Sequence, residues 1–321
     1  MSIPLVFIHQ QPRDSWYLPY VLYQARAFNP TSQLIVIGTG EFDCKGLGRF
    51  VEMGAYLADA RRFAAEYQHL STNLPPYEVF CFERWFILYA WMEKEGVETC
   101  FYVDSDMLIY ADVTQDTANY QGAELTYLGG GPLCGFISRA ALGRFCEFLL
   151  WFYRDPESLQ KARGYFEAVQ QRGVAGGVSD MTLFEWFRLQ EAEVQDATAQ
   201  STEVQSPFID ITQVVQGARY DLNINQTEGF KLRRKGDIKR VSFRKNQPFA
   251  TDATTQAPIR FKSLHFQGSA KLLIPQFVRP RGPQYQVFRL LLHTSPNHVY
   301  RAIRFRASLW RANLNTRLKR A

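Results

Sequence analysis

The chain has 321 residues, of which 46% are hydrophobic and 21% charged, with a formal net charge of +6. This composition excludes an intrinsically disordered chain, and the length suits one large α/β domain or two smaller ones. Five cysteines are scattered without a C-x-x-C pair, which indicates neither a zinc site nor a disulfide framework. The first residues lack the basic start of a signal peptide and no apolar run is long enough to span a membrane, so we expect a cytoplasmic protein.

Strands and helices are predicted to alternate along the first 190 residues. In chain order they are strand 4–8, helix 15–28, strand 34–38, helices 56–68 and 78–95, strands 100–104, 125–128 and 133–138, and helices 139–153 and 180–189. A strand–helix–strand opening predicts a βαβ unit with parallel strands. The fold class that follows is α/β, with a mixed, mainly parallel sheet flanked by helices.

The rest of the chain is less regular and becomes strongly basic. Residues 190–206 are polar and predicted to be loop, residues 230–243 a β-hairpin and residues 259–266 a last strand. No acidic residue follows Asp252, and the tail at 285–320 is predicted to hold two helices. We therefore expect a domain at 1–275 and a basic, aromatic C-terminal extension at 276–321.

Two carboxylates, one residue apart, end the apolar strand predicted at 100–104. Asp104 and Asp106, separated by Ser105, would be costly at a buried strand end without a partner, and a cation is the natural one. Alternate residues of a strand share a face, so both side chains are predicted to point at one ion. Oxygen ligands favour Mg²⁺ or Mn²⁺, which accept phosphate oxygens as further ligands.

A second polar segment, His265-x-x-Gly268-x-x-Lys271, follows the last predicted strand. The histidine could complete an Asp/Asp/His ligand set, which suits Mn²⁺ better than Mg²⁺. The glycine would let the backbone approach a phosphate, and the lysine offers it a positive charge. The two segments together predict a site for a metal-bound diphosphate.

These segments resemble the nucleotide-sugar glycosyltransferases of the GT-A fold, and most closely glycosyltransferase family 8, which includes glycogenin and bacterial lipooligosaccharide galactosyltransferases. The similarity covers about residues 1–275, and further likenesses lie at Gly177–Phe184 and Cys134–Ile137. It implies that Mn²⁺ (or Mg²⁺) binds Asp104, Asp106 and His265, and that Gly268 and Lys271 hold the diphosphate of a UDP-sugar. A retaining transfer to a glycan or lipid-linked acceptor is implied. The chain departs from the family pattern at Cys134, Met181, Leu272 and Leu273.

Three further side chains are candidates for the donor and acceptor sites. The resemblance implies that Asp180 lies near the acceptor and the anomeric carbon, and Asp180 is the candidate general base if the enzyme inverts. The alternative is that Asp180 is only an acid at a helix N-terminus, where a negative charge interacts favourably with the helix dipole. Arg84 could reach the donor phosphate or sugar, or form a structural ion pair with a neighbouring acid. His9 ends the first strand, where the nucleotide base and ribose usually lie in this fold.

Other readings remain open at this point. A nucleotidyl- or phosphotransferase could use the same metal–diphosphate site, although Gly38-Thr39-Gly40 lacks a phosphate-loop spacing. A non-catalytic nucleotide-sugar binder could keep the fold. The basic tail, Val299–Trp310 above all, is predicted to lie on the inner surface of a membrane, or else to pack on its own domain. Nucleic acid is not an expected partner, because no recognised binding motif is present.

Overall fold

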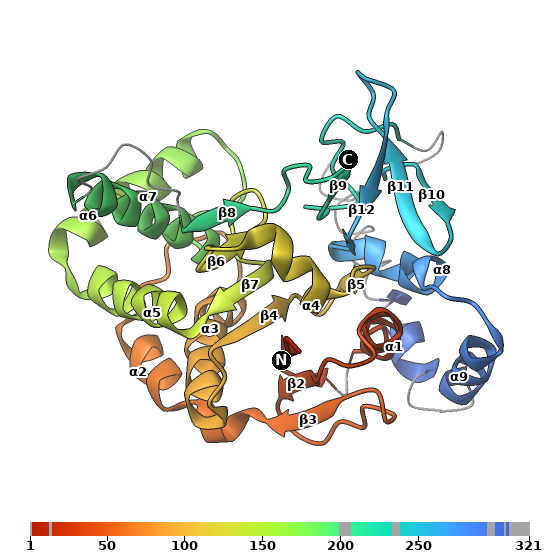
Figure 1. Ribbon diagram of the computed structural model, residues 1–321. Coiled ribbons are helices and arrows are strands. Elements are labelled where there is room, and N and C mark those ends of the chain that lie inside the picture. Colours follow the sequence, from red (N-terminus) through yellow and green to blue (C-terminus); the bar gives the residue numbers. More distant parts are fainter. Residues whose placement is uncertain are drawn as a thin grey trace, which may run out of the picture. The chain divides into compact units, whose positions relative to one another are not determined.

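The structure, a computed structural model, describes residues 2–12, 15–198, 207–232, 238–293, 299–304, 306 and 307, without the side chains of 193–198. The chain forms two compact units, each with its own strands and helices (Figure 1). Unit 1 comprises Met1–Ile8, Val51–Asp104 and Val113–Gln213, and unit 2 comprises His9–Phe50, Ser105–Asp112 and Val214–Ala321.

Unit 1 is built on a mainly parallel sheet. Its neighbouring strands, in spatial order, are β1 (Leu5–His9), β4 (Thr99–Val103), β7 (Cys134–Ser138), β6 (Leu125–Tyr127) and β8 (Phe208–Asp210). Strand β1 is parallel to β4 and β6 to β8, and among these five strands only β7 runs in the opposite direction. The predicted α/β class with a mainly parallel sheet is confirmed, and the short strand β8 was not predicted.

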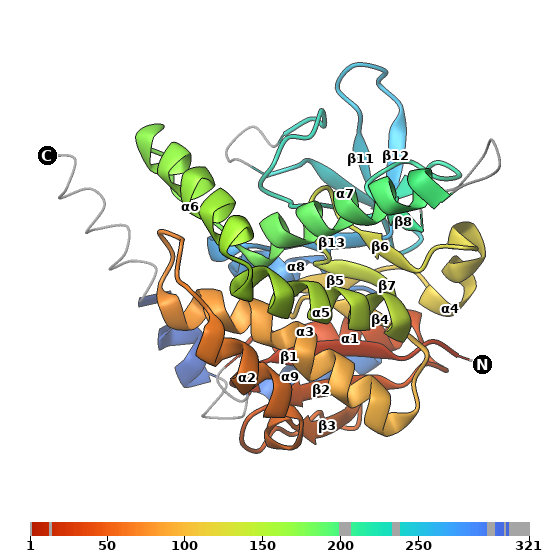
Figure 2. The same ribbon diagram turned by 90° about the vertical axis from the view of Figure 1, so that its left-hand side faces the viewer.

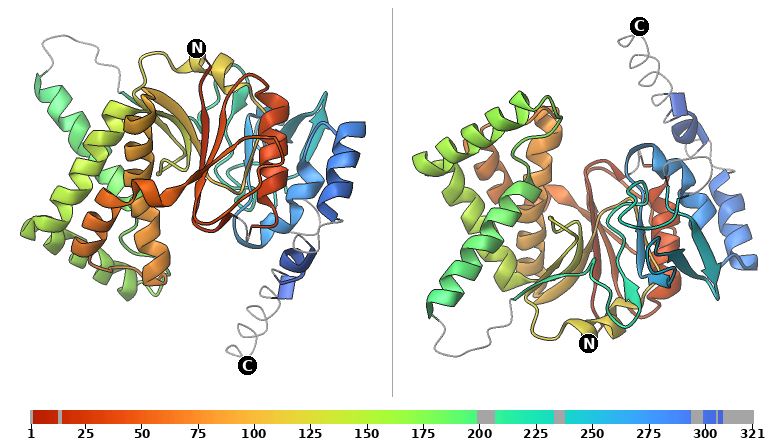
Figure 3. Two further views of the ribbon diagram at one scale, coloured as in Figure 1. Left: turned by 90° about the horizontal axis from the view of Figure 1, so that it is seen from below. Right: turned by 90° about the horizontal axis from the view of Figure 1, so that it is seen from above.

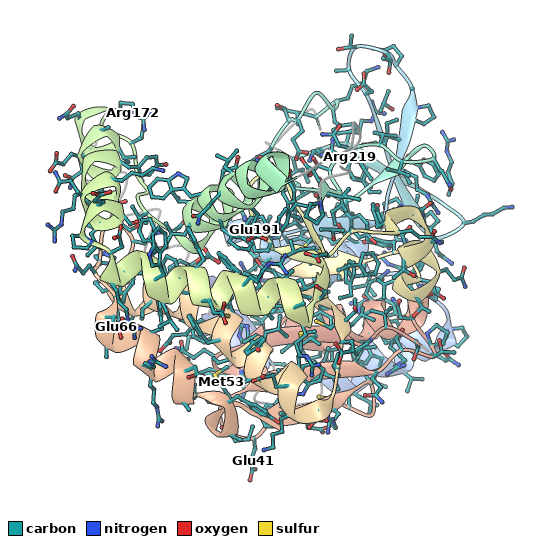
Figure 4. All side chains as sticks on the ribbon, turned by 60° about the vertical axis from the view of Figure 1, so that its left-hand side comes forward. Glu41, Met53, Glu66, Arg172, Glu191 and Arg219 are labelled. Carbon is teal, nitrogen blue, oxygen red and sulfur yellow. The ribbon has the colours of Figure 1, made fainter. Side chains whose placement is uncertain are left out.

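Five longer helices belong to unit 1. They are α2 (Ala58–Glu66), α3 (Pro75–Glu95), α5 (Arg139–Arg154), α6 (Pro156–Gln171) and α7 (Asp180–Thr198), and the shorter turns are η2 (Met53–Tyr56), α4 (Val113–Asp116) and η3 (Thr117–Tyr120). Figure 2 shows α3 and α5 running beside each other along the strands. Arg144 of α5 donates over 2.9 Å to Glu191 of α7, the residue that Figure 4 labels. Helix α3 buries Trp85 and Trp91, and α5 buries Phe145. This close packing makes α3 a rigid support for the side chains it carries.

The predicted loop at 190–206 was wrong in its first half, because α7 continues to Thr198. The segment after Leu189 is polar, but glutamate, glutamine and alanine are good helix formers, so polarity there indicates an exposed helix end. Helix α6 was also missed, although Asp155 caps it by accepting from the Ser158 amide over 2.8 Å.

Unit 2 contains α1 (Leu18–Phe28), β2 (Leu34–Gly38), and two further sets of paired strands, antiparallel except that β12 is parallel to β9. β5 (Met107–Ile109) pairs with β13 (Ser263–His265), while β10 (Val241–Arg244), β11 (Gln247–Thr251), β12 (Pro258–Phe261) and β9 (Ala218–Arg219) form a sheet in that order. Strand β3 (Arg49–Glu52) neighbours β2. The predicted strand 259–266 is thus two strands with different partners, divided at Lys262.

The two arms of the predicted hairpin at 230–243 do pair among the described residues, through an antiparallel bridge from Leu232 to Lys239 and the Arg240 amide, which donates to the Lys231 carbonyl over 2.7 Å. The predicted turn falls in residues 233–237, outside the described part. A second hairpin, which was not predicted, joins β10 to β11 through Lys245 and Asn246, whose φ angles of 48° and 65° fit a tight primed turn.

The C-terminal part of unit 2 is helical. Residues Gly268–Leu273 form η4, followed by α8 (Ile274–Phe277), α9 (Pro283–His293) and a helical stretch at 299–304. Phe288 of α9 stacks on Tyr23 of α1 at 4.7 Å between ring centroids, and the two helices lie side by side in Figures 1 and 3. Residues 294–298 and 308–321, where part of the tail prediction falls, lie outside the described residues. The division at 275/276 stays a prediction.

Candidate functional site

Arg84 is the centre of the polar site in unit 1. Its Nη1 lies 2.8 Å from Asp104 Oδ1 and its Nη2 lies 2.6 Å from Asp180 Oδ2. Tyr102 accepts from Nη1 over 3.1 Å and donates to Asp104 Oδ1 over 2.9 Å, while the Trp85 indole donates to Asp180 Oδ2 over 3.1 Å. We call these five residues the Arg84 cluster. It holds one positive and two negative charges in a largely buried place, so it is short of one positive charge.

The electrostatics of the Arg84 cluster keep the guanidinium charged. Burial alone would lower the pKa of Arg84, but Tyr102, Asp180 and Asp104 together raise it well above its ordinary value. Burial, outweighing the opposing charge of Arg84, raises the pKa of the Tyr102 hydroxyl. Tyr102 is therefore a neutral donor to Asp104. Removing one partner from such a buried pair typically costs about 3–5 kcal/mol, because the other charge is left unpaired.

Asp180 is held in place by the backbone on its N-terminal side. The Val178 amide donates to the Leu70 carbonyl over 2.8 Å, and the Gly176 carbonyl accepts from the Thr72 amide over 3.0 Å. Gly177 lies so close to this neighbour that an added Cβ would fall 2.3 Å from the Leu70 carbonyl oxygen. The Ser179 hydroxyl accepts from the Thr182 amide over 3.3 Å and so caps the start of α7.

The polar site of unit 2 joins the second acid to the late motif. His265 Nε2 lies 3.2 Å from Asp106 Oδ1, and Lys271 Nζ lies 2.6 Å from Asp106 Oδ2. The backbone fixes this geometry, because His265 pairs with Met107 in the β5·β13 ladder and the Phe266 amide donates to the Asp106 carbonyl over 3.0 Å. We call Asp106, His265 and Lys271, with Ser105, His9 and Tyr17 beside them, the His265 cluster.

The other nitrogen of His265 determines which form the ring takes. Nδ1 lies 2.7 Å from the Leu222 carbonyl oxygen, and a carbonyl oxygen can only accept, so Nδ1 carries a proton. In the neutral ring, Nε2 then presents a lone pair to a carboxylate oxygen. Two acceptors that face each other at 3.2 Å call for a cation between or beside them, either a proton or a metal ion.

Asp106 stays ionised although it is largely buried. Burial would raise its pKa, but the charges of His265 and Lys271 and their hydrogen bonds outweigh burial and hold the pKa of Asp106 well below its usual range. A carboxylate and an imidazole nitrogen that face each other fit a divalent cation of the Mn²⁺ type.

His9, Ser105 and Gly268 complete the His265 cluster and its border. His9 Nδ1 and the Ser105 hydroxyl lie 2.8 Å apart, and the His9 ring meets Tyr17 edge-on at 6.3 Å. Burial, and next the Asp106 carboxylate, raise the pKa of the Tyr17 hydroxyl. Gly268 opens η4 with φ of 56°, a left-handed conformation that favours glycine, and an added Cβ there would meet nothing within 4 Å.

The structure divides the predicted site residues between two clusters. Arg84, Asp104 and Asp180 belong to the Arg84 cluster, and the predicted ion pair of Arg84 with a neighbouring acid is confirmed twice over. Ser105, Asp106, His265, Lys271 and His9 belong to the His265 cluster. The predicted strand at 100–104 ends one residue early: β4 ends at Val103, so Asp104 and Asp106 follow the strand, each with partners of its own. That both carboxylates point at one ion stays a prediction.

Sequence reasoning missed Tyr17, Trp85, Tyr102 and Leu222. In the sequence, Trp85 follows Arg84 directly, and Tyr102 lies two residues before Asp104. Both are aromatic residues in apolar elements, so they look like core residues. Leu222 acts through its backbone carbonyl, which no sequence pattern marks.

Known proteins similar to this chain come from solved structures alone, since no family model and no curated protein matches it. One is mouse xyloside xylosyltransferase 1 in its apo form, with 10% identity and a TM-score of 0.41, covering 60% of this chain and 83% of that one. Two are structures of LgtC, one of an active-site mutant and one of the galactosyltransferase in complex with donor and acceptor sugar analogues. Each has 11% identity and a TM-score of 0.39, covering 89% of this chain and all of that one. These likenesses are too low to carry a functional argument, which depends on the side chains.

Proposed function

We propose that this chain is a metal-dependent glycosyltransferase that moves a sugar from a nucleotide-sugar, UDP-linked, to a glycan or lipid-linked acceptor. The observation that carries the proposal is the pair His265 Nε2 and Asp106 Oδ1, 3.2 Å apart, with the Lys271 ammonium 2.6 Å from the other carboxylate oxygen. A metal cation held by His265 and Asp106, with the Lys271 ammonium beside it, suits a diphosphate, because the cation and the ammonium can both neutralise negative charge on the phosphates.

Asp104 is the third ligand in this proposal. It lies two residues before Asp106 in the turn after β4, so the chain itself keeps its carboxylate within a short reach of Asp106. Arg84 and Tyr102 hold Asp104 Oδ1, which fixes the position of this carboxylate. A bound Mn²⁺ or Mg²⁺ would act as a Lewis acid on the departing diphosphate. Gly268 would let the backbone approach the phosphates, and His9 and Ser105 would contact the nucleoside.

The proposed reaction exchanges one bond to the anomeric carbon for another. The bond from this carbon to the diphosphate oxygen breaks, and its electron pair leaves with the nucleoside diphosphate. An acceptor hydroxyl oxygen bonds to the same carbon, and its proton passes to the released phosphate oxygen. Lys271 and Arg84 are the side chains that would stabilise the negative charge growing on the leaving group.

Asp180 supports retention of configuration rather than inversion. An inverting enzyme needs a carboxylate free to accept the proton of the acceptor hydroxyl. Asp180 is 3% exposed, and its Oδ2 already accepts from Arg84 and Trp85. We propose that Asp180 positions the donor sugar and stabilises positive charge at the anomeric carbon, which is the role it would have in a retaining transfer.

A membrane surface is the proposed location of the acceptor. No helix among the described residues is long and apolar enough to cross a bilayer. Helix α9 nevertheless exposes Val287, Leu290 and Leu291 at 58%, 65% and 65%, while its opposite face buries Tyr285, Phe288 and Leu292. No acidic residue lies from 253 to 321 to oppose an anionic surface. An apolar face in a basic setting favours peripheral binding to anionic lipid.

The test of the main proposal is calorimetric titration of UDP into the protein with and without Mn²⁺, repeated on Asp106→Asn. We expect Mn²⁺-dependent binding in the wild type and at least a tenfold weaker affinity in the variant, because one ligand charge is lost. Asp43→Asn is the matched control, since Asp43 is an exposed carboxylate paired with Lys45. Incubation with UDP-sugars should then release UDP.

Two other outcomes would redirect the assignment. Release of inorganic diphosphate or transfer of a phosphate would favour the nucleotidyl- or phosphotransferase alternative. Metal-dependent binding without turnover on any acceptor would favour a non-catalytic nucleotide-sugar binder. If the folded wild type bound no nucleotide at all, the glycosyltransferase proposal and both alternatives would be contradicted.

A further inference from the structure

A buried charged network lies behind His265 in unit 2. Lys239 is 0% exposed, and its ammonium lies 2.5 Å from Asp221 Oδ1 and 2.9 Å from the Asn223 carbonyl oxygen. Lys239 also pairs with Glu228, and Glu228 with Arg219, which Figure 4 labels. We call Arg219, Asp221, Glu228 and Lys239 the Lys239 network. It contains two positive and two negative charges, so it is neutral as a whole.

The Lys239 network holds one segment, residues 221–225, against the strand that carries His265. Asp221 Oδ2 accepts from the His265 backbone amide over 3.2 Å, and the Ile224 amide donates to the His265 carbonyl over 2.9 Å. Between these two contacts lies the Leu222 carbonyl, which accepts from His265 Nδ1 over 2.7 Å. The backbone amide, the backbone carbonyl and the ring of His265 are thus all hydrogen-bonded to this segment.

Lys239 also holds the segment 221–225 in place through its own hydrogen bonds. Its amide donates to the Ile224 carbonyl over 2.9 Å while its ammonium holds Asp221 and Asn223, so one residue contacts the segment at three places. Buried ion pairs contribute little to stability compared with apolar residues of the same volume, and the use best supported for them is to select one arrangement among several. Here the selected arrangement is the one that aims the Leu222 carbonyl at Nδ1.

We propose that Asp221 and Lys239 are positioning residues that set the tautomer and orientation of His265. By holding the Leu222 carbonyl on Nδ1, they keep the Nε2 lone pair directed at Asp106. The part of this inference that concerns metal affinity depends on the proposed function; the part that concerns the tautomer does not. A hydrogen-bonding partner on the far nitrogen of a metal-binding histidine typically changes metal affinity about 10–100-fold.

The experiment measures the two parts separately. Long-range ¹H–¹⁵N NMR of the metal-free protein at pH 8 reports which nitrogen of each imidazole carries the proton, and the His265→Gln variant assigns the His265 signal among the five histidines. Free Mn²⁺ measured by electron paramagnetic resonance gives the metal affinity. Both are applied to the wild type, to Asp221→Asn, and to the double variant Asp221→Asn with Lys239→Met, which removes both charges together.

We expect Nδ1 of His265 to carry a proton in the wild type, whether or not Nε2 also binds one. The double variant should show a mixture of tautomers with Mn²⁺ binding weakened at least tenfold, and Asp221→Asn a smaller change in the same direction, which keeps the test valid if the double variant does not fold. Tyr285→Phe is the matched control: it removes a hydrogen bond of unit 2, from the Tyr285 hydroxyl to the Pro275 carbonyl at 2.9 Å, and Tyr285 lies on helix α9, outside the Lys239 network. It should lower the melting temperature and leave the tautomer unchanged.

Three results would overturn the inference. They are an Nε2–H tautomer in the wild type, an unchanged tautomer in both variants, and an equal change in Tyr285→Phe. If the wild type binds no Mn²⁺ at all, the proposed metal site fails, and the NMR result alone still decides the role of Asp221 and Lys239.

Discussion

The guanidinium of Arg84 donates to Asp180 over 2.6 Å, joining two residues that are 96 positions apart in the sequence. The same guanidinium holds Asp104 through its other terminal nitrogen, so the acid after β4 and the acid that begins α7 share one cation. A change at Arg84 therefore acts on two carboxylates at once, and both belong to the proposed donor site.

Arg84→Lys is expected to lower transferase turnover about 100-fold, because a single ammonium cannot span both carboxylates and small displacements of positioning groups cost about that much. Arg84→Met should also lower the free energy of unfolding by about 3–5 kcal/mol, since it leaves buried carboxylates unpaired. Urea denaturation and initial rates with a UDP-sugar would measure the two effects. Arg139→Lys, in an exposed pair with Glu98, is the control and should change neither by much. Full activity in Arg84→Lys would contradict the proposed site.

Cys81 should report the charge of Asp180. Burial first, and next the Asp180 carboxylate, raise the pKa of the Cys81 thiol to about 12, so at pH 8 only about one molecule in ten thousand carries the reactive thiolate. Asp180→Asn removes a negative charge, which lowers the pKa of Cys81 and should speed its alkylation by iodoacetamide at pH 9. Cys44, with a pKa raised to about 11 mainly by burial, is the control. Peptide mass spectrometry would follow both sites, and equal acceleration at Cys44 would indicate general loosening instead.

Lys271→Met is expected to separate nucleotide binding from metal binding. Lys271 contacts one oxygen of Asp106, so its loss frees that oxygen and should leave Mn²⁺ affinity in the absence of nucleotide equal or tighter. UDP affinity in the presence of Mn²⁺ should fall about 10–100-fold, the value of a charge-assisted hydrogen bond of about 1.5–3 kcal/mol. Calorimetry of both ligands provides the measurement. A variant that lost Mn²⁺ affinity and kept UDP affinity would reverse the roles assigned here.

Gly177→Ala should disturb Asp180 through the backbone. The new methyl group would lie 2.3 Å from the Leu70 carbonyl oxygen and 2.6 Å from Ser71 Cα, so the pairing that positions the start of α7 must open. We expect a loss of about 1–3 kcal/mol in unfolding free energy together with reduced activity. Gly164→Ala, in helix α6 with nothing within 4 Å, should instead stabilise the protein by about 0.5–1 kcal/mol. Thermal and urea unfolding of the two variants would show whether the signs are opposite.

Membrane binding should depend on the exposed face of α9. The protein is expected to sediment with vesicles of phosphatidylglycerol and not with vesicles of phosphatidylcholine, and to release at high salt. Val287→Glu combined with Leu290→Glu adds negative charge to this face and should reduce the bound fraction several-fold. Leu74→Glu changes a leucine of unit 1 that is 77% exposed and should leave binding unaltered. Equal binding to both kinds of vesicle, or none, would refute the proposed membrane contact.

Much of this protein could be predicted from its sequence, because the relevant signals are local. Apolar runs predicted strands β1, β2, β4, β6 and β7 and the helices between them, since the period of an element depends on neighbouring residues. The chemistry-bearing motifs, Asp104-Ser105-Asp106 and His265-x-x-Gly268-x-x-Lys271, were also visible, because strand ends of an α/β sheet are where polar residues gather.

The partners of those motifs depended on tertiary structure alone. Whether Asp106 or Asp104 faces His265, whether Arg84 serves one acid or two, and which carbonyl fixes the His265 tautomer are contacts between residues far apart in the chain. Such pairings depend on how elements pack and on which buried charges must be neutralised together. A one-dimensional pattern shows which groups need a partner, and only the packed fold determines which partner each one has.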